Sequence, residues 1–398
     1  MVRLWQRNGI GGAGRPTPGR VKEVQAVVMA GGRGERLHPL TAVRPKPLVP
    51  LFGRPLLGYL VGHLTSCGIA EIFITAGHLG EQIEAYIAGL PADARLHCRV
   101  EGTPRGTAGA VADLLPRLRS PFLVVSGDAV IDIDLAAILR AHRQDGNAVT
   151  LCLAPPVERL RFGTVALAGR CIRRFLEKPS LADLLPELHI NTGCYLIDRG
   201  VLEGLPPEGG VDFALDVFPR LLERRQPLGA VQGARFWRDV GTLEAYREAH
   251  FDGLRGMLPW RLPAAVVPTG RAGDLVHLGR DVDIAAGARI IGPAVIGDRC
   301  RVGREAEVTR CVLLEGASVG PGATIRDCVL DRGARVPAGW RLAGAGVAAG
   351  RTALDRHCRR RTYPGRPTAA GTEPEKLPQG PRPADEPEES FAEAAPAT

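Results

Sequence analysis

Residues 24–37 read VQAVVMAGGRGERL, and this stretch carries the strongest indication of fold class in the chain. Its first half, Val24–Ala30, is a short apolar run that ends in glycines, a pattern typical of a buried parallel strand entering a phosphate-binding loop. The glycines let the backbone approach a polyphosphate and turn N–H groups toward it, and Arg36 can add a bidentate contact. Because no G-K-[ST] follows, the loop is not a Walker A motif. The stretch therefore predicts a first buried strand and an anion-binding loop.

Strand and helix patterns alternate through the residues that follow. Helices are expected at Leu56–Cys67, Glu81–Ile87 and Thr107–Leu118, and strands at Glu71–Ala76, Leu96–Val100 and Phe122–Ser126. Such alternation indicates βαβ units, hence a mostly parallel sheet with helices on both faces, whose ligands bind beyond the carboxyl ends of the strands. Because Gly31–Arg36, Glu101–Thr107 and Gly127–Asp128 all follow strands, we expect them to line one cleft. Residues 148–255 continue with mixed strands and helices and would form its other wall.

A different period starts near Val276. Apolar residues recur at every sixth position, and after a slip of one residue the series resumes at Val319 and Ile325. The first seven members are Leu278, Ile284, Ile290, Ile296, Val302, Val308 and Leu314. A six-residue step fits neither a helix nor an alternating strand. It predicts a parallel β-helix of hexapeptide turns, in which each coil stacks on the last and buries a continuous core.

Changes of composition suggest four segments. We expect a disordered leader at 1–22, an α/β domain at 23–258, a β-helix at 259–345 and a disordered tail at 346–398. The leader is rich in Gly and Arg without a periodic pattern, and the end of the tail has many prolines and seven acidic residues against three basic ones over 366–398. The cluster Arg356–Arg361 is interpreted as a solvated surface, with anion or partner binding as the alternative.

The overall composition excludes several classes of protein. With 45% hydrophobic and 24% charged residues among 398, the chain matches a soluble globular protein of two or three domains. It contains no apolar run of the roughly 18 residues that a membrane span needs, and residues 1–20 do not form a signal peptide. The net charge of +8 comes from arginines spread along the chain, without the basic stripe of a nucleic-acid-binding surface. Nine scattered cysteines without a C-x-x-C pair indicate a reducing, cytoplasmic location.

Lysine is rare, which makes its positions informative. Of 51 basic residues only four are lysine, namely Lys22, Lys46, Lys178 and Lys376. An ammonium is a compact charge that a guanidinium fork does not replace. Lys46 stands between two prolines in Arg44-Pro45-Lys46-Pro47, which restrict its backbone. This framing predicts a site that needs one positive charge held in one direction.

Together these motifs resemble the signature of the sugar-1-phosphate nucleotidyltransferases. AGGRGERLHPLT at 30–41 is followed by RPKPLVPL at 44–51. The match continues, in order, through EGTPRGTAGA at 101–110, SGDAV at 126–130, FLEKP at 175–179, INTGCY at 190–195 and FWRDVGT at 236–242. The resemblance covers residues 24–340 and implies a Rossmann-like nucleotidyltransferase domain followed by a left-handed β-helix.

The resemblance also implies roles for single residues in a reaction between a nucleoside triphosphate and a hexose 1-phosphate. Asp128 and Asp239 would bind Mg²⁺, a hard cation that prefers carboxylate and phosphate oxygens. Arg36 and Lys46 would neutralise the triphosphate, and Lys178 would hold the sugar phosphate. The nucleotide would lie against Ala30, Gly31, Gly32, Gly34, Glu101, Gly106 and Thr107. The sugar would lie against Gly163, Glu177, Asn191 and Gly193.

The nucleobase and the sugar stay open at this point. The E-x-x-P-x-G-T-A-G form, the chain length and the short β-helix most resemble mannose-1-phosphate guanylyltransferases, which favours GTP and mannose 1-phosphate. Enzymes that use dTTP or UTP with glucose or N-acetylhexosamine 1-phosphate share most of these residues. A non-catalytic regulatory subunit on the same fold would lose lysine or metal positions, whereas all are present here. The β-helix is expected to mediate homo-oligomer contacts rather than acyl transfer, since His277 is its only histidine.

Overall fold

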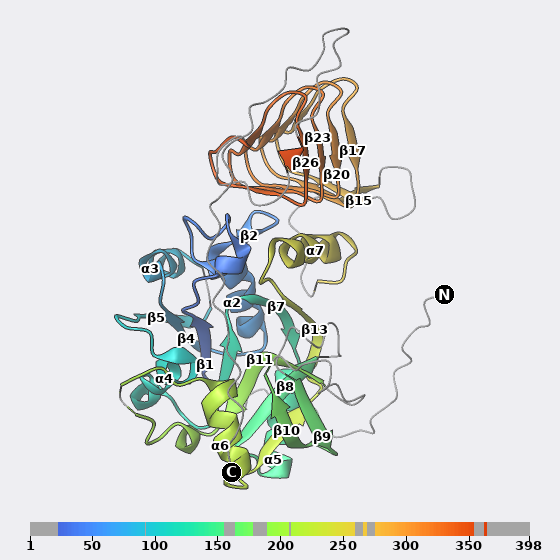
Figure 1. Cartoon of the computed structure of the whole chain (residues 1–398). Helices are drawn as coiled ribbons and strands as arrows, with labels where there is room; N and C mark the ends of the chain where they lie inside the picture. The colour runs from blue at the N-terminus through green and yellow to red at the C-terminus, as the bar shows by residue number, and fades with distance from the viewer. Residues whose placement is uncertain are drawn as a thin grey trace, which may run out of the picture. The chain divides into compact units, whose positions relative to one another are not determined.

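A computed structural model describes residues 23–91, 93–154, 164–177, 189–206, 208–258, 266–268, 275–353 and 362–363 (Figure 1). The chain divides into two compact units, residues 1–365 and 366–398, and the second unit lies outside the described residues. The predicted leader 1–22 and the Arg356–Arg361 cluster lie outside them as well. In the first unit an α/β fold comes first, followed by a stack of short strands drawn in orange in Figure 1.

The α/β fold is built on a nine-stranded sheet in the order β5-β4-β1-β6-β11-β8-β12-β10-β9. Its strands are β1 (Ala26–Ala30), β4 (Glu71–Ala76), β5 (Arg95–Val100), β6 (Phe122–Ser126), β8 (Val149–Ala154), β9 (Thr164–Ala168), β10 (Cys171–Leu176), β11 (His189–Ile197) and β12 (Leu228–Val231). Strand β1 pairs in parallel with β4 and with β6, so the predicted parallel arrangement is confirmed for the amino-terminal strands. Strands β4 and β6 have the predicted bounds.

Strand β1 is buried on both faces, which explains its continuous apolar sequence. Val28 packs in one hydrophobic cluster with helices α2 (Leu56–Ser66) and α3 (Gly80–Ala88). Val27 points to the opposite face and packs in a second cluster with α4 (Gly106–Ala112) and α6 (Phe218–Glu223). Helices therefore cover both faces of the sheet, as the alternation of patterns predicted. The other α-helices of the described residues are α5 (Leu135–Asp145) and α7 (Leu243–Leu254).

The carboxy-terminal half of the sheet mixes both strand directions. Strand β11 is antiparallel to β6 and β8, whereas β12 is parallel to β8. Strands β10 and β9 complete the edge as an antiparallel pair. The register of β11 shifts between Asn191 and Cys194, where Gly193 has a φ of 75°, a conformation that favours glycine. This bulge brings the 190–195 motif alongside the end of β6.

One helix ends before its predicted bound because of a proline. The helix expected over Thr107–Leu118 ends at Ala112 and is followed by a 3₁₀ turn, Leu115–Arg117. Pro116 has no N–H to donate to the carbonyl of Ala112, so the α-helix cannot continue through it. Within residues 148–255, where mixed strands and helices were expected, a π-helical turn, Phe213–Val217, leads directly into α6. Further 3₁₀ turns lie at Glu35–Leu37, Lys46–Leu48 and Arg199–Val201.

The predicted β-helix is confirmed as three faces of stacked parallel strands. The first face is β15 (Leu275–Leu278), β18 (Ala294–Ile296), β21 (Val312–Leu313), β24 (Val329–Leu330) and β27 (Gly346–Val347). The second is β16 (Asp283–Ile284), β19 (Arg301–Val302), β22 (Ser318–Val319) and β25 (Arg335–Val336). The third is β17 (Arg289–Ile291), β20 (Glu307–Thr309), β23 (Thr324–Arg326) and β26 (Arg341–Ala343). Strands β14 (Val266–Pro268) and β28 (Thr362–Tyr363) add antiparallel partners to β15 and β26.

The β-helix differs from its sequence prediction in three respects. At the slip, Leu313 rather than Leu314 packs in the interior, because the step there is five residues, and Leu314 packs against the α/β fold instead. Ile284 is 40% exposed, since it lies in the first coil and β16 pairs, among the described strands, with β19 alone. Strand β27 pairs with β24 beyond the end expected at 345, and the described residues continue from 346 to Ala353.

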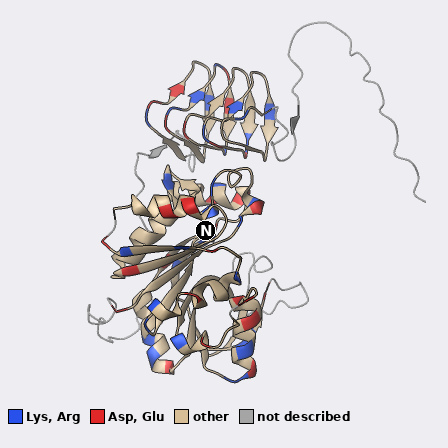
Figure 2. Cartoon of the chain, turned by 90° about the vertical axis from the view of Figure 1, so that its left-hand side faces the viewer, with Lys and Arg blue, Asp and Glu red and all other residues tan. Residues whose placement is uncertain are grey.

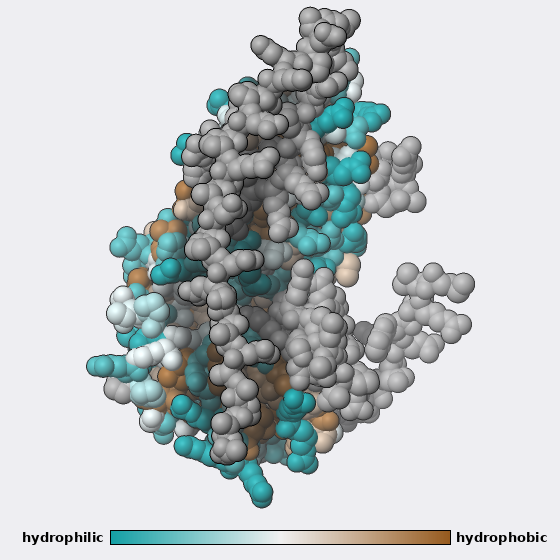
Figure 3. All heavy atoms as spheres, viewed as in Figure 1, coloured by the Kyte–Doolittle hydropathy of each residue, from teal (hydrophilic) through white to brown (hydrophobic). Residues whose placement is uncertain are grey.

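A shared hydrophobic cluster joins the α/β fold to the β-helix. Leu40 and Tyr246 of the former pack in it with Val312 and Val329 of the latter, all of them buried. Basic and acidic residues are interspersed over the described elements in Figure 2, and the described surface visible in Figure 3 is largely hydrophilic. Among the described helices, none has the length and hydropathy that crossing a bilayer requires.

Candidate active site

Three of the predicted residues meet at one point. Lys46 Nζ donates to Asp128 Oδ2 at 2.6 Å and lies 3.4 Å from Asp239 Oδ1. Asp128 stands in the turn between β6 and β7 (Ala129–Ile133), and Asp239 ends β13 (Ala234–Asp239). Strands β7 and β13 pair antiparallel with Asp239 opposite Ala129, which places the two carboxylates side by side. Residues far apart in the chain therefore form one charged cluster.

The loop that carries Lys46 is held by its prolines and by contacts with the glycine loop. Pro45 is extended and precedes the 3₁₀ turn that begins at Lys46, whose side chain is buried. The Thr41 hydroxyl donates to the carbonyl of Gly34 at 2.8 Å and ties this loop to the glycine loop. Gly34 has a φ of 66°, and a Cβ there would lie 3.0 Å from Thr41 Cγ2 and 3.1 Å from Lys46 Cβ. Glycine is required at 34 both for its conformation and for this close approach.

Asp128 is oriented by Ser126, a residue of the SGDAV motif for which no role was predicted. The Ser126 hydroxyl donates to Asp128 Oδ1, leaving Oδ2 for Lys46. Gly193 of β11 packs against Ser126, and a Cβ at 193 would come within 3.0 Å of Ser126 Cβ. The S-G-D spacing at the end of a buried strand is the signal that could have identified Ser126, because a hydroxyl two residues before a carboxylate can donate a hydrogen bond to it.

The pKa shifts within the cluster follow from burial and from the three charges. Burial alone would lower the pKa of Lys46, but Asp128 and Asp239 outweigh it and raise the pKa above its ordinary value. Burial alone would raise the pKa of Asp128, yet the Lys46 ammonium and the hydrogen bonds from Lys46 and Ser126 hold that pKa below its ordinary value. Burial raises the pKa of Asp239, and the Asp128 carboxylate adds to the rise against the opposing charges of Lys46 and Arg36. The ion pair is therefore Lys46 with Asp128, and Asp239 is the carboxylate that protonates more readily.

Arg36 and Gly241 complete the cluster. Arg36 lies in the 3₁₀ turn after the glycine loop, and its charge acts on Asp239. A Cβ at Gly241 would lie 2.4 Å from Asp239 Oδ2 and 3.1 Å from Arg36 Nη2. Any side chain at 241 would thus displace both groups. Gly241 is a site residue that the sequence motif contained but that only the packing identifies.

The residues expected at the nucleotide meet at the ends of β1, β4 and β5. A Cβ on Gly31 would lie 3.2 Å from Glu101 Oε1 and 3.6 Å from the backbone nitrogen of Gly77, so Glu101 closes over the glycine loop. Burial raises the pKa of Glu101, and its Oε2 accepts from the backbone N–H of Arg105 at 3.2 Å. The Ala30 side chain belongs to the core, whereas a Cβ on Gly32 would meet open space. The loop is thus packed at Gly31 and open at Gly32.

Gly106 and Thr107 are already engaged by the protein itself. The Thr107 hydroxyl donates to Asp212 Oδ2 at 2.7 Å and accepts from the backbone N–H of Phe213 at 2.9 Å. Gly106 has a φ of 71°, and a Cβ there would lie 2.5 Å from the carbonyl oxygen of Val211. These contacts join α4 to the segment before α6. They fix the position of the loop that begins at Glu101.

The residues expected at the sugar are described in part. Asn191 Nδ2 donates to the Tyr195 hydroxyl at 3.0 Å, and Asn191 Oδ1 accepts from the backbone N–H of Gly193 at 3.2 Å. Glu177 is exposed just after β10. Lys178 and Gly163 lie outside the described residues.

The two carboxylates of the cluster suit a divalent cation. Asp128 and Asp239 converge on one positive charge, the Lys46 ammonium, so their oxygens already form a site that accepts a cation. Within the described ranges no group of three or more His, Cys, Asp and Glu side chains gathers as a metal site. Two carboxylates leave the other positions around a hard cation to phosphate oxygens and water, which is the usual arrangement for Mg²⁺ at phosphate-transfer sites.

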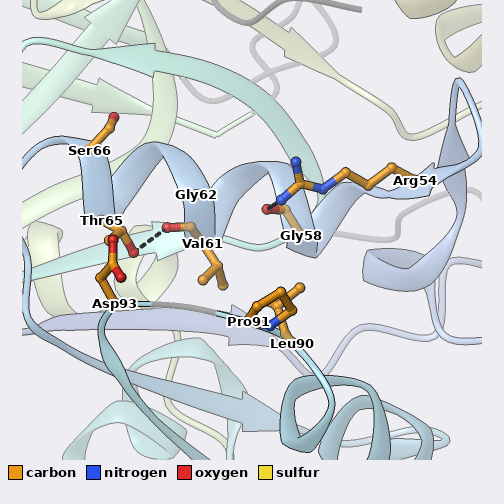
Figure 4. Close-up of a pocket in the computed structure, with 9 residues that line it drawn as sticks. All are labelled: Arg54, Gly58, Val61, Gly62, Thr65, Ser66, Leu90, Pro91 and Asp93. Carbon is orange, nitrogen blue, oxygen red and sulfur yellow. Dashed lines mark hydrogen bonds between the residues drawn. The ribbon is translucent and has the colours of Figure 1, made fainter. Parts of the chain in front are cut away.

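Two cavities lie away from this cluster. One, of about 280 Å³, lies beside α2; Figure 4 shows Arg54 reaching along the helix to the carbonyl of Gly58, with Leu90 and Pro91 below. It contains none of the predicted site residues. The other, of about 830 Å³, lies between the α/β fold and the β-helix and is lined by residues of both, among them Arg44 and Asp331.

Comparison with known proteins gives two family matches. The nucleotidyl transferase family matches residues 25–255, and the GlmU-like C-terminal hexapeptide family matches residues 278–351. A mannose-1-phosphate guanylyltransferase of Mycobacterium tuberculosis is 32% identical over 307 residues, 76% of this chain and 83% of that protein. A UTP–glucose-1-phosphate uridylyltransferase of a Synechocystis strain is 28% identical over 76% of this chain and 86% of its own. A probable mannose-1-phosphate guanylyltransferase 1 of Oryza sativa is 27% identical over 76% and 84%.

Proposed function

Because the chain belongs to the nucleotidyl transferase family, we propose that it joins GTP to mannose 1-phosphate and releases GDP-mannose and pyrophosphate. Nucleotidyl transfer to a sugar 1-phosphate is the activity that its relatives' names share. The choice of GTP and mannose is supported by the names of two relatives, one of them 32% identical. The name of another favours UTP and glucose 1-phosphate, which is the alternative.

The observation that carries the proposal is the position of Lys46 Nζ, 2.6 Å from Asp128 and 3.4 Å from Asp239. In the reaction, an oxygen of the sugar phosphate forms a bond to the α-phosphorus while the bond to the bridging oxygen breaks, and that electron pair leaves with pyrophosphate. The attacking phosphate is already ionised, so the step needs no general base. What it needs is positive charge that brings two anions together in line.

The residues of this chain supply that charge from one side. Lys46 is buried and fixed, so its ammonium loses little freedom when phosphate oxygens replace part of its contact with Asp128. Arg36 would grip the triphosphate with its planar fork. The backbone N–H groups around Gly31 and Gly32 would face the phosphates, with the base beyond them toward Glu101. Lys178, Glu177, Asn191 and Gly193, with Gly163, would hold the sugar phosphate on the opposite side.

Enzymes of this family generally use a divalent metal. We assign Asp128 and Asp239 as its ligands and propose Mg²⁺, which would neutralise charge on the phosphate oxygens when bound. Gly241 keeps Asp239 and Arg36 close enough to act on the same phosphates, because a glycine leaves room for both.

A panel of substrates tests the proposal. Purified full chain is offered GTP, UTP, dTTP and ATP, each with mannose, glucose or N-acetylglucosamine 1-phosphate and Mg²⁺, and pyrophosphate release is measured. We expect the highest kcat/KM with GTP and mannose 1-phosphate. A preference for UTP with glucose 1-phosphate would change the proposed substrates but leave the proposed reaction, nucleotidyl transfer, unchanged. No turnover with any pair would favour a non-catalytic regulatory subunit and overturn the proposal.

We also propose a homo-oligomer in the cytoplasm, with the β-helix as the contact between subunits. An open solenoid end leaves strand edges and apolar side chains uncovered, as Ile284 is here at 40% exposure. Light scattering after size exclusion measures the mass. A mass of one chain would contradict the oligomer, and Ile284→Arg should lower the mass if this end forms the contact.

A further inference from the structure

Lys46 and Asp239 lie in two segments whose side chains contact the β-helix. Lys46 belongs to the Arg44–Pro47 motif, and Asp239 is followed, after a short turn, by α7. Neither segment is covalently near the β-helix. Side chains of both segments nevertheless contact the same coil of the β-helix, Asp327–Asp331.

The first link is an ion pair. Arg44 Nη1 donates to Asp331 Oδ1 at 2.8 Å. The Asp331 side chain is 0% exposed and that of Arg44 is 17% exposed, so water and salt screen this pair weakly. Asp331 Oδ1 also accepts from the backbone N–H of Arg332 at 2.7 Å, which fixes the carboxylate to the coil. Arg44 is thus held two residues before Lys46.

The second link holds α7. Arg247 Nη1 donates to the carbonyl oxygen of Asp327 at 2.6 Å, and Arg247 Nη2 lies 3.4 Å from Asp327 Oδ1. Arg310 Nε donates to the same carboxylate at 3.1 Å, and Arg310 Nη2 donates to Glu248 of α7 at 2.9 Å. Between the two aspartates, Val329 is buried in the cluster shared with the α/β fold. One coil therefore contacts both segments at once.

We propose that the coil Asp327–Asp331 positions the catalytic cluster: Asp331, through Arg44, and Asp327, through Arg247, keep Lys46 and Asp239 in register with each other. The inference rests on the proposed function, because it takes Lys46 and Asp239 as groups that contact the substrates. The β-helix is then part of the active site's support and not only a contact surface. Reaction rates depend steeply on such alignment, since a displacement of about 1 Å can cost about 100-fold.

The test compares Asp331→Leu with a matched control, Glu307→Leu. Glu307 is also a carboxylate of the β-helix paired with an arginine, Arg289, but that pair stays within the β-helix. For Asp331→Leu we expect kcat at saturating substrates to fall about 10-fold or more, with both KM values changed much less, as for lost alignment. Hydrogen exchange should quicken at the amides of Lys46, Leu48 and Val49, and not in β1. Glu307→Leu should change neither kcat nor this exchange.

Asp331→Leu alone leaves Arg44 unpaired and can lower stability, so a double variant separates the two effects. Arg44→Met with Asp331→Leu replaces the pair by apolar side chains and restores the Tm. If the coil positions the site, kcat stays low while the Tm recovers. If the coil is only structural, kcat recovers together with the Tm, and the proposal is overturned.

Failure of the proposed function would look different. A wild-type chain without turnover on any substrate pair refutes the function, while the exchange measurement still reports whether Asp331 restrains the Lys46 loop. An active wild type whose kcat and exchange are unchanged by Asp331→Leu refutes the inference alone.

Discussion

Lys46 Nζ lies 2.6 Å from Asp128 Oδ2, although 82 residues separate the two in the chain. The lysine side chain is 7% exposed and the aspartate side chain 36%. One partner is thus buried and fixed while the other faces the open side of the site. Because of this difference in exposure, Asp128 can exchange its partner during the reaction while Lys46 stays in place.

Replacement of Asp128 should therefore affect turnover more than folding. For Asp128→Asn we expect kcat to fall at least about 100-fold, because a charge at the reacting phosphates is lost. The Tm should fall little, since Lys46 keeps its contact with Asp239. Pyrophosphate release and a thermal melt measure the two quantities.

Asp132 provides the control for this variant. It lies on β7 in the same hairpin, where its largely buried carboxylate accepts two hydrogen bonds from the exposed Arg235. Asp132→Asn should leave turnover within about twofold, because the ion-pair partners of Asp132 are Arg235 and His63 and not the Lys46 cluster. Equal losses in the two variants would contradict a specific role for Asp128.

Gly241→Ala should disturb the site without touching the substrates. Its new Cβ would stand 2.4 Å from Asp239 Oδ2 and force that carboxylate, and Arg36 beside it, to shift. We expect kcat to fall by about 10- to 100-fold. Gly200→Ala, where a Cβ meets nothing within 4 Å, is the matched control and should behave as wild type. Full activity of Gly241→Ala would show that Asp239 can move without cost.

Glu101→Gln should act on the nucleotide and not on the sugar phosphate. Glu101 packs against Gly31 at the end of the sheet where the base is expected, and glutamine can keep its hydrogen bond from Arg105. We expect the KM for the nucleoside triphosphate to rise about 10-fold, as for a lost hydrogen bond to a charged group. The KM for the sugar phosphate should stay unchanged. Equal rises in both KM values would show that Glu101 does not act on the nucleotide specifically.

His250 should make stability depend on pH. Burial lowers the pKa of His250 to about 3, and the ring stays neutral between the carbonyl of Tyr246 and the N–H of Phe52. Because the unfolded chain binds this proton at its ordinary pKa near 6.5, the stabilisation is complete above that pH and is lost as the pH falls toward 3.

Comparison with His250→Gln isolates this term, since other buried histidines are present in both proteins. The free energy of unfolding of the wild type should fall relative to the variant by about 3 kcal/mol between pH 7 and pH 4. Urea melts at each pH measure the difference. A difference that does not change with pH would mean that His250 is not buried in its neutral form.

Much of the fold could be read from local pattern. Val24–Ala30 predicted a buried strand because both of its faces are apolar, and β1 is covered by helices on both sides. The six-residue period predicted the β-helix because each coil repeats the same inward positions. Local pattern was wrong in two places. The helix after Gly106 ends before Pro116, and at the five-residue step of the β-helix Leu314 points outward instead of inward.

The sequence by itself determined which residue types are available to the site: the glycine loop, Lys46 between two prolines, and Asp128 and Asp239 within the motifs SGDAV and FWRDVGT. They offer backbone N–H groups, a positive charge and carboxylates, which suit the binding of phosphates and a hard cation. Only the tertiary structure decided which atoms meet. The pairing of β7 with β13 brings Asp239 to Asp128, and the coil at Asp331 reaches Arg44 across 287 residues. Such contacts depend on how distant segments pack, and packing is set by the whole buried surface and not by any short motif.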